Sequence, residues 1–306
     1  MVNLLAPAVP CYSPVTAYTV SGGGVTFTQL GRFDIIGTIQ LPCNGCIGCR
    51  LDRASMWSLR VVHEASLHAE NCFVTLTYDE AHLPPGGSLR YRDCQLFIKR
   101  LRRANPGKLI RYYLCGEYGD NLSRPHYHIC LFGHSFSDQS LLKKTISNSL
   151  IYHSPSLTKL WPLGLSSVGS LNKQSAGYTA RYCMKKINGD LAESHYRHVD
   201  PETGEITQRE PEFNHMSLKP GIGAQWYDKF HGDVHLHDHV IHDGRRHSVP
   251  HYYNKLASRR STYDVEQLKQ DRILKALPHR EDNTPERLAV KAEVKRARIR
   301  TLLRSL

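Results

Sequence analysis

Two histidines and a carboxylate near the middle of the chain have the types and spacing of a divalent-metal site. His126 and His128 begin a short apolar segment that ends at Gly133, and Glu117 precedes them across the polar loop 119–125. Residues i and i+2 of a strand point to the same face, so the two imidazoles would project side by side. A hairpin through that loop would bring Glu117 next to them. Two imidazoles and one carboxylate, with coordination positions left open, suit a metal ion that polarises a phosphate.

The His-x-His spacing has low specificity by itself. The chain contains 18 histidines in 306 residues, and the same spacing recurs within residues 235–239. For His126 and His128 the alternative is an ordinary half-buried strand. The downstream histidines could bind a metal from one face of a strand, or flank a hairpin that turns at 243–244.

A second group of chemically active side chains lies in the segment 172–187, which has helical periodicity and Asn172 as a candidate N-cap. The apolar stripe predicted for this helix consists of Ala176, Ala180, Cys183 and Ile187. Tyr178, Tyr182 and Lys185 are out of phase with that stripe, so they lie on roughly the opposite face. Two tyrosines one turn apart beside a lysine are candidate catalytic groups. The alternative is an amphipathic helix whose tyrosines cover surface.

The His-x-His strand preceded by an acidic residue, together with the Tyr-x-x-x-Tyr helix, resembles the HUH endonucleases, which nick single-stranded DNA through a phosphotyrosine. The finer resemblance is to the replication initiators of microviruses, single-stranded DNA phages, in their gokushovirus-like branch. Four stretches carry it in the family's order: 42–50, 73–78, 116–128 and 217–226. They span most of the first 230 residues.

This resemblance implies a metal-dependent, site-specific single-strand endonuclease and ligase that starts rolling-circle replication. The implied roles are metal binding (Mg²⁺ or Mn²⁺) by Glu117, His126 and His128, nucleophilic attack by Tyr178 and Tyr182, and charge stabilisation by Lys185 or Lys186. The product would be a 5′-phosphotyrosine with a free 3′-OH. The implied partners are single-stranded DNA at the phage origin and the host DNA polymerase and helicase, in the host bacterial cytoplasm.

Three other functions fit part of the pattern. A plasmid relaxase or HUH transposase would share the chemistry, but the cysteine run and the Pro-Gly-Ile-Gly sequence at 220–223 favour the phage initiator. A hydrolytic metallonuclease would use only the histidine site and leave no covalent adduct. A non-enzymatic, zinc-containing DNA-binding protein with a basic tail would bind origin DNA without cutting it.

The order of the predicted elements indicates an α+β fold, with an antiparallel sheet covered by helices on one face and a ferredoxin- or RRM-like core. The resemblance places both histidines on a central strand. The expected elements are a helix at 52–70, a strand at 73–78, a helix at 91–104, a hairpin at 109–132, a helix near 137–150 and the tyrosine helix. The resemblance also implies an extra β-hairpin near 231–247, without metal, and the chain is predicted to be helical from 263 onward.

We predict four segments along the chain. They are an N-terminal segment with the cysteine run and a helix at 1–70, the HUH endonuclease core at 71–190, a loop-rich β extension at 191–258 and a basic helical tail at 259–306. The tail could bind DNA or a partner helix. The predicted helix at 91–104 also carries a basic cluster, formed by Lys99, Arg100, Arg102 and Arg103. That cluster is either a solvated face or a surface for phosphates next to the nuclease site.

Cys43, Cys46 and Cys49 form a C-x-x-C-x-x-C run ahead of a helix. Thiolates at this spacing suit a structural Zn²⁺ or an iron–sulfur cluster, either of which normally needs a fourth ligand. Cys11, Cys72 or a histidine could supply it; the alternative is three reduced cysteines in a turn. Nine cysteines, an odd number with no secretory signal before them, indicate a reducing cytoplasm.

The charge balance points to a polyanionic partner. Lys and Arg number 40 against 28 Asp and Glu, for a net charge of +12 with neutral histidine. Nucleic acid is the first candidate, although many basic proteins bind none. No apolar run approaches the length of a membrane span, so no membrane partner is expected. No G-x-x-x-x-G-K-[ST] sequence occurs, so we expect no helicase in this chain.

Overall fold

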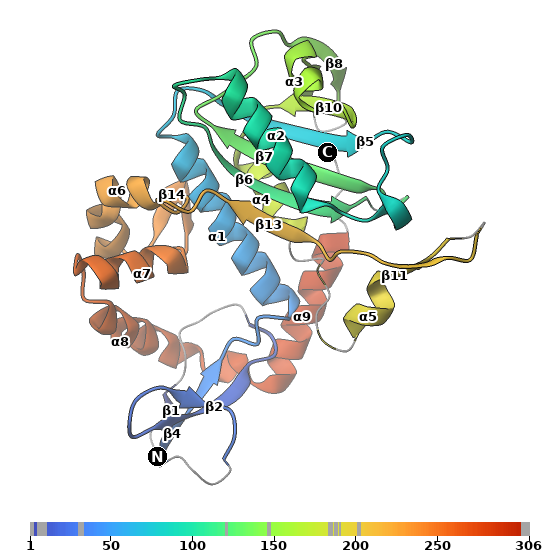
Figure 1. Ribbon diagram of the computed structural model, residues 1–306. Helices are drawn as coiled ribbons and strands as arrows, with labels where there is room; N and C mark the ends of the chain where they lie inside the picture. Colours follow the sequence, from blue (N-terminus) through green and yellow to red (C-terminus); the bar gives the residue numbers. More distant parts are fainter. Residues whose placement is uncertain are drawn as a thin grey trace. The chain divides into compact units, whose positions relative to one another are not determined.

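The computed structural model describes the chain except for residues 1–2, 5–10, 30–33, 120–121, 146–147, 183–185, 187–188, 190, 201–202 and 301–306. It divides into two compact units (Figure 1). One unit combines residues up to Met56 with those from His231 onward, and the other runs from Trp57 to Phe230. The histidine site lies in the second unit and the cysteine run in the first. The four predicted segments, with boundaries at 70, 190 and 258, stay a prediction.

The second unit is built on a seven-stranded sheet in the order β13-β6-β7-β5-β10-β9-β8. Its strands are β5 Asn71–Tyr78, β6 Arg111–Tyr118, β7 Pro125–Phe132, β8 Ser140–Lys144, β9 Leu150–His153, β10 Gly164–Gly169 and β13 Phe213–Met216. All neighbours pair antiparallel. The elements β5, α2, β6, β7, α3 and β10 follow one another as βαββαβ, and their strands lie in the ferredoxin-like order. The predicted α+β fold with an antiparallel sheet is confirmed.

Helices cover both faces of this sheet, although the sequence predicted one covered face. The helices are α2 Tyr91–Ala104 and α3 Pro155–Leu160 on one face, and α1 Ile47–Ala65 and α4 Lys173–Tyr182 on the other. The reason is visible in β7, where residues 129–132 are Ile-Cys-Leu-Phe and all four are buried. A continuous apolar run, in place of strict alternation, is typical of a strand covered on both sides.

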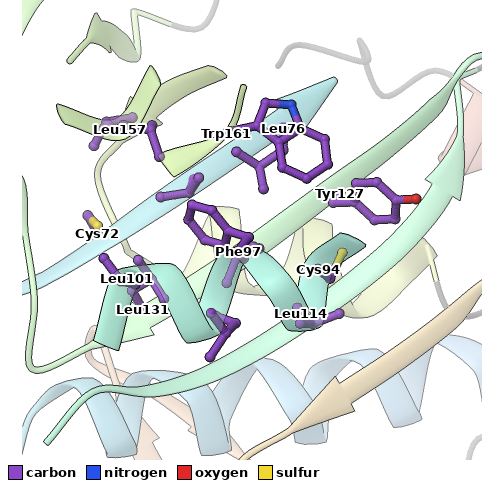
Figure 2. Close-up of a cluster of buried hydrophobic side chains, with 14 of the residues drawn as sticks. Cys72, Leu76, Cys94, Phe97, Leu101, Leu114, Tyr127, Leu131, Leu157 and Trp161 are labelled. Carbon is purple, nitrogen blue, oxygen red and sulfur yellow. The ribbon is translucent and has the colours of Figure 1, made fainter. Parts of the chain in front are cut away.

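The larger apolar core lies between the sheet and α2 (Figure 2). Phe97 and Leu101 of α2 pack there with Leu131 of β7, and Tyr127 and Trp161 close the cluster. The even-numbered residues of β5 and the odd-numbered residues of β7 face this core. The opposite residues of both strands, including His126 and His128, therefore face the side of α1 and α4.

The basic cluster predicted on α2 does not adjoin the histidines, because α2 covers the other face of the sheet. Two of its members also have structural partners. Arg100 donates from Nε to the carbonyl of Leu160 at 2.8 Å, and Arg102 donates to the carbonyl of Ile110 at 2.9 Å. The interpretation of this cluster as a phosphate surface next to the nuclease site is wrong.

The helix predicted near 137–150 is also wrong, since β8 and β9 form an edge hairpin there. The chain reverses at a turn in which Thr145 and Ser149 share a backbone hydrogen bond and Asn148 has a φ of 62°. Leu141 and Leu142 are both exposed, so the segment has no single apolar face to bury against the sheet. A left-handed residue and an unburied pair of leucines favour a hairpin over a helix.

The first unit combines a small sheet with helices. Its strands are β1 Asn3–Leu4, β2 Val15–Val20, β3 Val25–Thr26, β4 Ile35–Leu41, β14 Val240–His242 and β15 Arg245–His247. Its helices are the end of α6 Ala224–Leu236, α7 His251–Arg260, α8 Val265–Ala276 and α9 Pro285–Arg300. The hairpin turning at 243–244 and the helical tail are confirmed. No described helix is long and apolar enough to cross a bilayer.

The downstream histidines do not line a strand. His235 is buried in α6, His237 and His239 follow in a turn, and His239 binds the carbonyl of His237 through Nδ1 at 2.7 Å. The interpretation of these three as a metal-binding strand face is wrong. The remaining elements of the chain are α5 Leu191–Tyr196, β11 Arg197–Val199, β12 Ile206–Gln208 and three short 3₁₀ turns.

Candidate metal and nucleophile site

The hairpin of β6 and β7 brings the predicted ligands onto one face. Glu117 pairs in register with His126, and Cys115 pairs with His128. His128 Nε2 lies 3.1 Å from Glu117 Oε1, and both side chains are buried. Glu117 is only 2% exposed, so this carboxylate is held away from solvent beside an imidazole.

His126 lies on the same strand face but points toward the loop. Its Nε2 is 2.8 Å from the position that a Cβ on Gly119 would occupy, so only glycine fits there without moving the ring. In the described part of the chain, only a cysteine group has three or more ligand atoms within 4.8 Å of one another. Glu117 and His128 therefore meet in this structure, while His126 Nε2 stands apart from them.

The donor set nevertheless fits a divalent ion. The Nδ1 atoms of both histidines are hydrogen bonded to threonine hydroxyls of β5, at 3.1 Å for His128 and 2.9 Å for His126. The Nε2 atoms are thus the nitrogens that could bind a metal, next to the oxygens of Glu117. Imidazole nitrogen with carboxylate oxygen is a ligand set that accepts Mn²⁺ and tolerates Mg²⁺.

The helix α4 places Tyr178 against this site. Asn172 caps the helix as predicted, because its Oδ1 accepts hydrogen bonds from the backbone N–H groups of Gln174 and Ser175. The ring of Tyr178 meets that of His128 edge to face, with centroids 5.0 Å apart. Two segments separated by about fifty residues of sequence therefore converge on one spot.

Tyr178 does not lie opposite the packed side of α4, as the periodicity predicted. Ala176 and Ala180 are buried as expected, but Ser175 and Thr179 are buried as well. The buried arc is wider than the apolar stripe, because Thr179 bonds the carbonyl of Ser175 and adjoins the sheet at Cys130. Tyr178 borders this arc and is half-buried. Cys183, Lys185, Ile187 and the side chain of Tyr182 are outside the described residues.

The start of α4 is fixed by α1. Ser58 Oγ donates to the carbonyl of Lys173 at 2.9 Å, and the same hydroxyl lies 3.6 Å from where a Cβ on Gly177 would be. The close approach of the two helices thus occurs one residue before Tyr178.

A second candidate site is the cysteine group of the first unit. Cys43, Cys46 and Cys49 are joined by Cys11, and all four Sγ atoms lie within 4.8 Å of one another. Cys11 is therefore the fourth ligand that the sequence left open, and Cys72 is buried in the core of the other unit. The backbone N–H groups of Tyr12, Cys43, Cys46 and Cys49 each point at a sulfur of the group, at 3.2–3.5 Å. Four converging thiols could hold a structural metal such as Zn²⁺.

The electrostatics of the cysteine group favour thiolate at one position. Burial alone would raise the pKa of Cys46, but the backbone N–H groups of Cys49 and Tyr12 and the neighbouring thiols lower it to about 6. Burial and the bonds to Cys11 and Cys46 raise the pKa of Cys49. One ready thiolate among protonated neighbours is the usual state of such a group before a cation displaces the remaining protons.

Comparison with known proteins identifies the family. A family model described as replication-associated protein ORF2 matches residues 71–187. The replication-associated protein VP4 of Bdellovibrio phage phiMH2K is 30% identical over 251 residues, which cover 79% of this chain and 75% of that protein. The replication-associated protein ORF2 of Spiroplasma virus 4 is 32% identical over 255 residues, covering 78% and 74%. This chain belongs to the phage replication-associated proteins.

The predicted resemblance to microvirus replication initiators is thereby confirmed. The replication-associated protein ORF4 of Chlamydia phage 1 is also similar, at 28% identity over 259 residues covering 78% of this chain and 61% of that protein. No solved structure matches the chain. The family match at 71–187 contains Glu117, both histidines and Tyr178, so the site lies in the part of this replication-associated protein that the family shares.

The stretch at 217–226 has a structural role in this replication-associated protein. Buried Glu64 of α1 accepts a hydrogen bond from the N–H of Gly223 at 2.7 Å. Arg111, at the start of β6, donates to the carbonyl of Pro220 at 2.7 Å and is paired with Glu64. Because a buried charge needs such partners, this loop is fixed to both α1 and β6.

Proposed function

We propose that this protein nicks and rejoins single-stranded origin DNA to start rolling-circle replication, through a covalent 5′-phosphotyrosine. The observation that supports this most directly is the position of Tyr178, whose ring lies 5.0 Å from that of His128. A nucleophile beside a candidate metal ligand is the arrangement that phosphoryl transfer to a tyrosine requires.

The proposed reaction exchanges one phosphodiester for another. The tyrosine oxygen attacks the scissile phosphorus, a P–O(tyrosine) bond forms and the P–O3′ bond breaks, so the 3′ oxygen leaves as a hydroxyl once protonated. Mg²⁺ or Mn²⁺ held by Glu117, His126 and His128 would supply Lewis-acid stabilisation of the phosphate charge. The reverse attack by a 3′-OH restores the DNA strand and frees the tyrosine, without an external energy source.

The residues of the chain contribute orientation and charge. A tyrosine phenol has a pKa near 10 in water, so it needs nearby positive charge to react as phenolate at neutral pH. Lys185 or Lys186 would supply part of that charge. Tyr182 would act as the second nucleophile, which lets one tyrosine hold a 5′ end while the other attacks. The proposed partners are origin DNA and the host polymerase and helicase, in the cytoplasm of the infected bacterium.

A denaturing gel of the protein with end-labelled single-stranded origin DNA and Mn²⁺ tests this function. The proposal predicts a cut strand and a slow-migrating band that protease removes. Cutting without such a band would identify a hydrolytic metallonuclease, and binding without cutting would identify a non-enzymatic DNA-binding protein. A relaxase or transposase would form the same band but on a different DNA sequence.

For Glu117, we expect replacement by alanine or glutamine to raise the Mn²⁺ concentration needed for half-maximal cleavage by about 10-fold or more. The reason is that its buried carboxylate lies 3.1 Å from His128 Nε2. The glutamine variant keeps the side-chain volume and removes only the charge. Glu80→Gln, at an exposed carboxylate paired with Arg124, is the matched control and should leave the titration unchanged. An unshifted curve for Glu117→Gln would remove this residue from the metal site.

We further propose that the cysteine group binds one structural Zn²⁺. Elemental analysis of the purified protein should give one zinc per chain, and Cys11→Ala should lose it and unfold at a lower temperature, because a three-cysteine site binds more weakly. Cys72→Ala is the control, since Cys72 was the other cysteine that could have completed the site. Zinc retained by Cys11→Ala but lost by Cys72→Ala would contradict the assignment.

A further inference from the structure

Two threonines of β5 hold the two histidines of β7 by the same contact. Thr75 lies directly opposite His128 in the strand register, and Thr77 lies opposite His126. The threonine Oγ1 and histidine Nδ1 atoms are 3.1 Å apart in the first pair and 2.9 Å apart in the second. Both rings are therefore attached to β5 through the same nitrogen, which leaves Nε2 of each as the nitrogen not bonded to β5.

The proton positions explain why a hydroxyl suits this place. A neutral imidazole carries one N–H and one lone pair, so a histidine that binds a metal through Nε2 must hold its proton on Nδ1. In that form the threonine oxygen accepts the Nδ1–H bond. When His128 instead donates from Nε2 to Glu117, which is 3.1 Å away, Thr75 can donate its own proton to Nδ1. One hydroxyl thus satisfies the ring with and without a bound ion.

We infer that Thr75 and Thr77 are positioning residues of the proposed metal site, which orient the imidazoles and keep the proton on Nδ1 when Nε2 binds a divalent cation. This inference rests on the proposed function, because it assigns the histidines to a metal. Ligating histidines usually have a carboxylate or a carbonyl as this outer partner. A hydroxyl orients the ring without adding negative charge, which fits a hard, exchangeable ion better than one that stays bound permanently.

An ordinary structural explanation makes a different prediction. Threonine is common at half-buried strand positions because its branched side chain packs well on a pleated surface. Valine keeps that branched shape and removes the hydroxyl, whereas serine keeps the hydroxyl and removes the methyl group. If packing is the role, serine should do more harm than valine; if the hydrogen bond is the role, valine should do more harm than serine.

The experiment is a Mn²⁺ titration of the full chain without DNA, in which electron paramagnetic resonance measures the free ion. We expect Thr75→Val and Thr77→Val each to raise the Mn²⁺ concentration at half-saturation by about 10-fold or more. Thr75→Ser should stay within about threefold of the unaltered protein. Thermal unfolding of each variant shows whether the fold is retained. Ser167→Ala is the matched control, because Ser167 lies opposite Thr75 on β10, one strand further from the histidine.

Two results would overturn the inference. One is a Thr→Val titration identical to that of the unaltered protein, and the other is an equal weakening by valine, serine and the Ser167 control together with a lower unfolding temperature. His128→Ala in the same titration separates this inference from the proposed function. If His128→Ala abolishes Mn²⁺ binding and the valine variants bind normally, only the positioning role fails. If His128→Ala binds normally too, the metal assignment fails with it.

Discussion

Replacing both Tyr178 and Tyr182 by phenylalanine should abolish the covalent protein–DNA adduct while leaving DNA binding intact. Each phenylalanine keeps the ring that packs in α4 and removes only the attacking oxygen. The two positions are four residues apart, about 6 Å along a helix at 1.5 Å per residue, so both can address one phosphate with small adjustments. The measurement is the amount of protease-sensitive, slow-migrating labelled DNA on a denaturing gel with Mn²⁺.

The single variants decide whether the two tyrosines alternate. On the proposed function each single variant still forms an adduct, at unequal rates, and each fails to complete repeated rounds of circle release. Tyr263→Phe, in the other unit, is the control for loss of a tyrosine hydroxyl. If one single substitution removes all adduct and the other is silent in multi-round assays, the helix holds one nucleophile and one bystander.

His126→Ala and His128→Ala should each reduce nicking by roughly 100-fold or more and leave single-stranded DNA binding largely unchanged. Both side chains lie on the same strand face, and their Nε2 atoms are the nitrogens not bonded to β5. The assays are cleavage of labelled origin DNA over a Mn²⁺ series and a parallel gel-shift experiment.

His237→Ala is the matched control for these variants, since His237 has the same His-x-His spacing in the sequence but is exposed in a turn. It should nick at the unaltered rate. Cleavage at the unaltered rate by both His126→Ala and His128→Ala, still sensitive to EDTA, would place the metal elsewhere. In that case a histidine outside β7 would have to supply the ligand.

The sequence predicted the parts of the fold whose local signals agree with the final packing. The strand at 73–78, the helix at 91–104 and the histidine hairpin all appear close to their predicted bounds, because apolar periodicity and turn residues coincide there. The helix near 137–150 fails because propensity was counted without knowing that Asn148 would adopt a left-handed conformation. Covered faces are a tertiary property, so the burial of β7 on both sides could be inferred only from its Ile-Cys-Leu-Phe run.

The candidate site was predictable in its residue types but not in its supporting contacts. The spacing of His126 and His128 indicates a shared face, yet only the register of β5 shows that two threonines stand opposite them. The Thr-x-Thr of 75–77 next to His-x-His was the available signal, since equal spacing on paired strands gives equal partners. Cys11 could not be chosen from spacing, because it is separated from Cys43 by the whole N-terminal sheet.

The central place of β7 has a consequence for how the two halves of the site can move. β7 is hydrogen bonded to β6 and β5 on either side, and residues 127–132 are buried. Its amides can exchange with solvent only when the whole unit opens, so the histidines belong to the last region to lose structure. The nucleophile lies on the ten-residue helix α4, at the margin of the same core. Local opening of that helix costs less than opening the sheet, and a 5′ end attached to Tyr178 can therefore be carried away from, and returned to, a histidine frame that stays still.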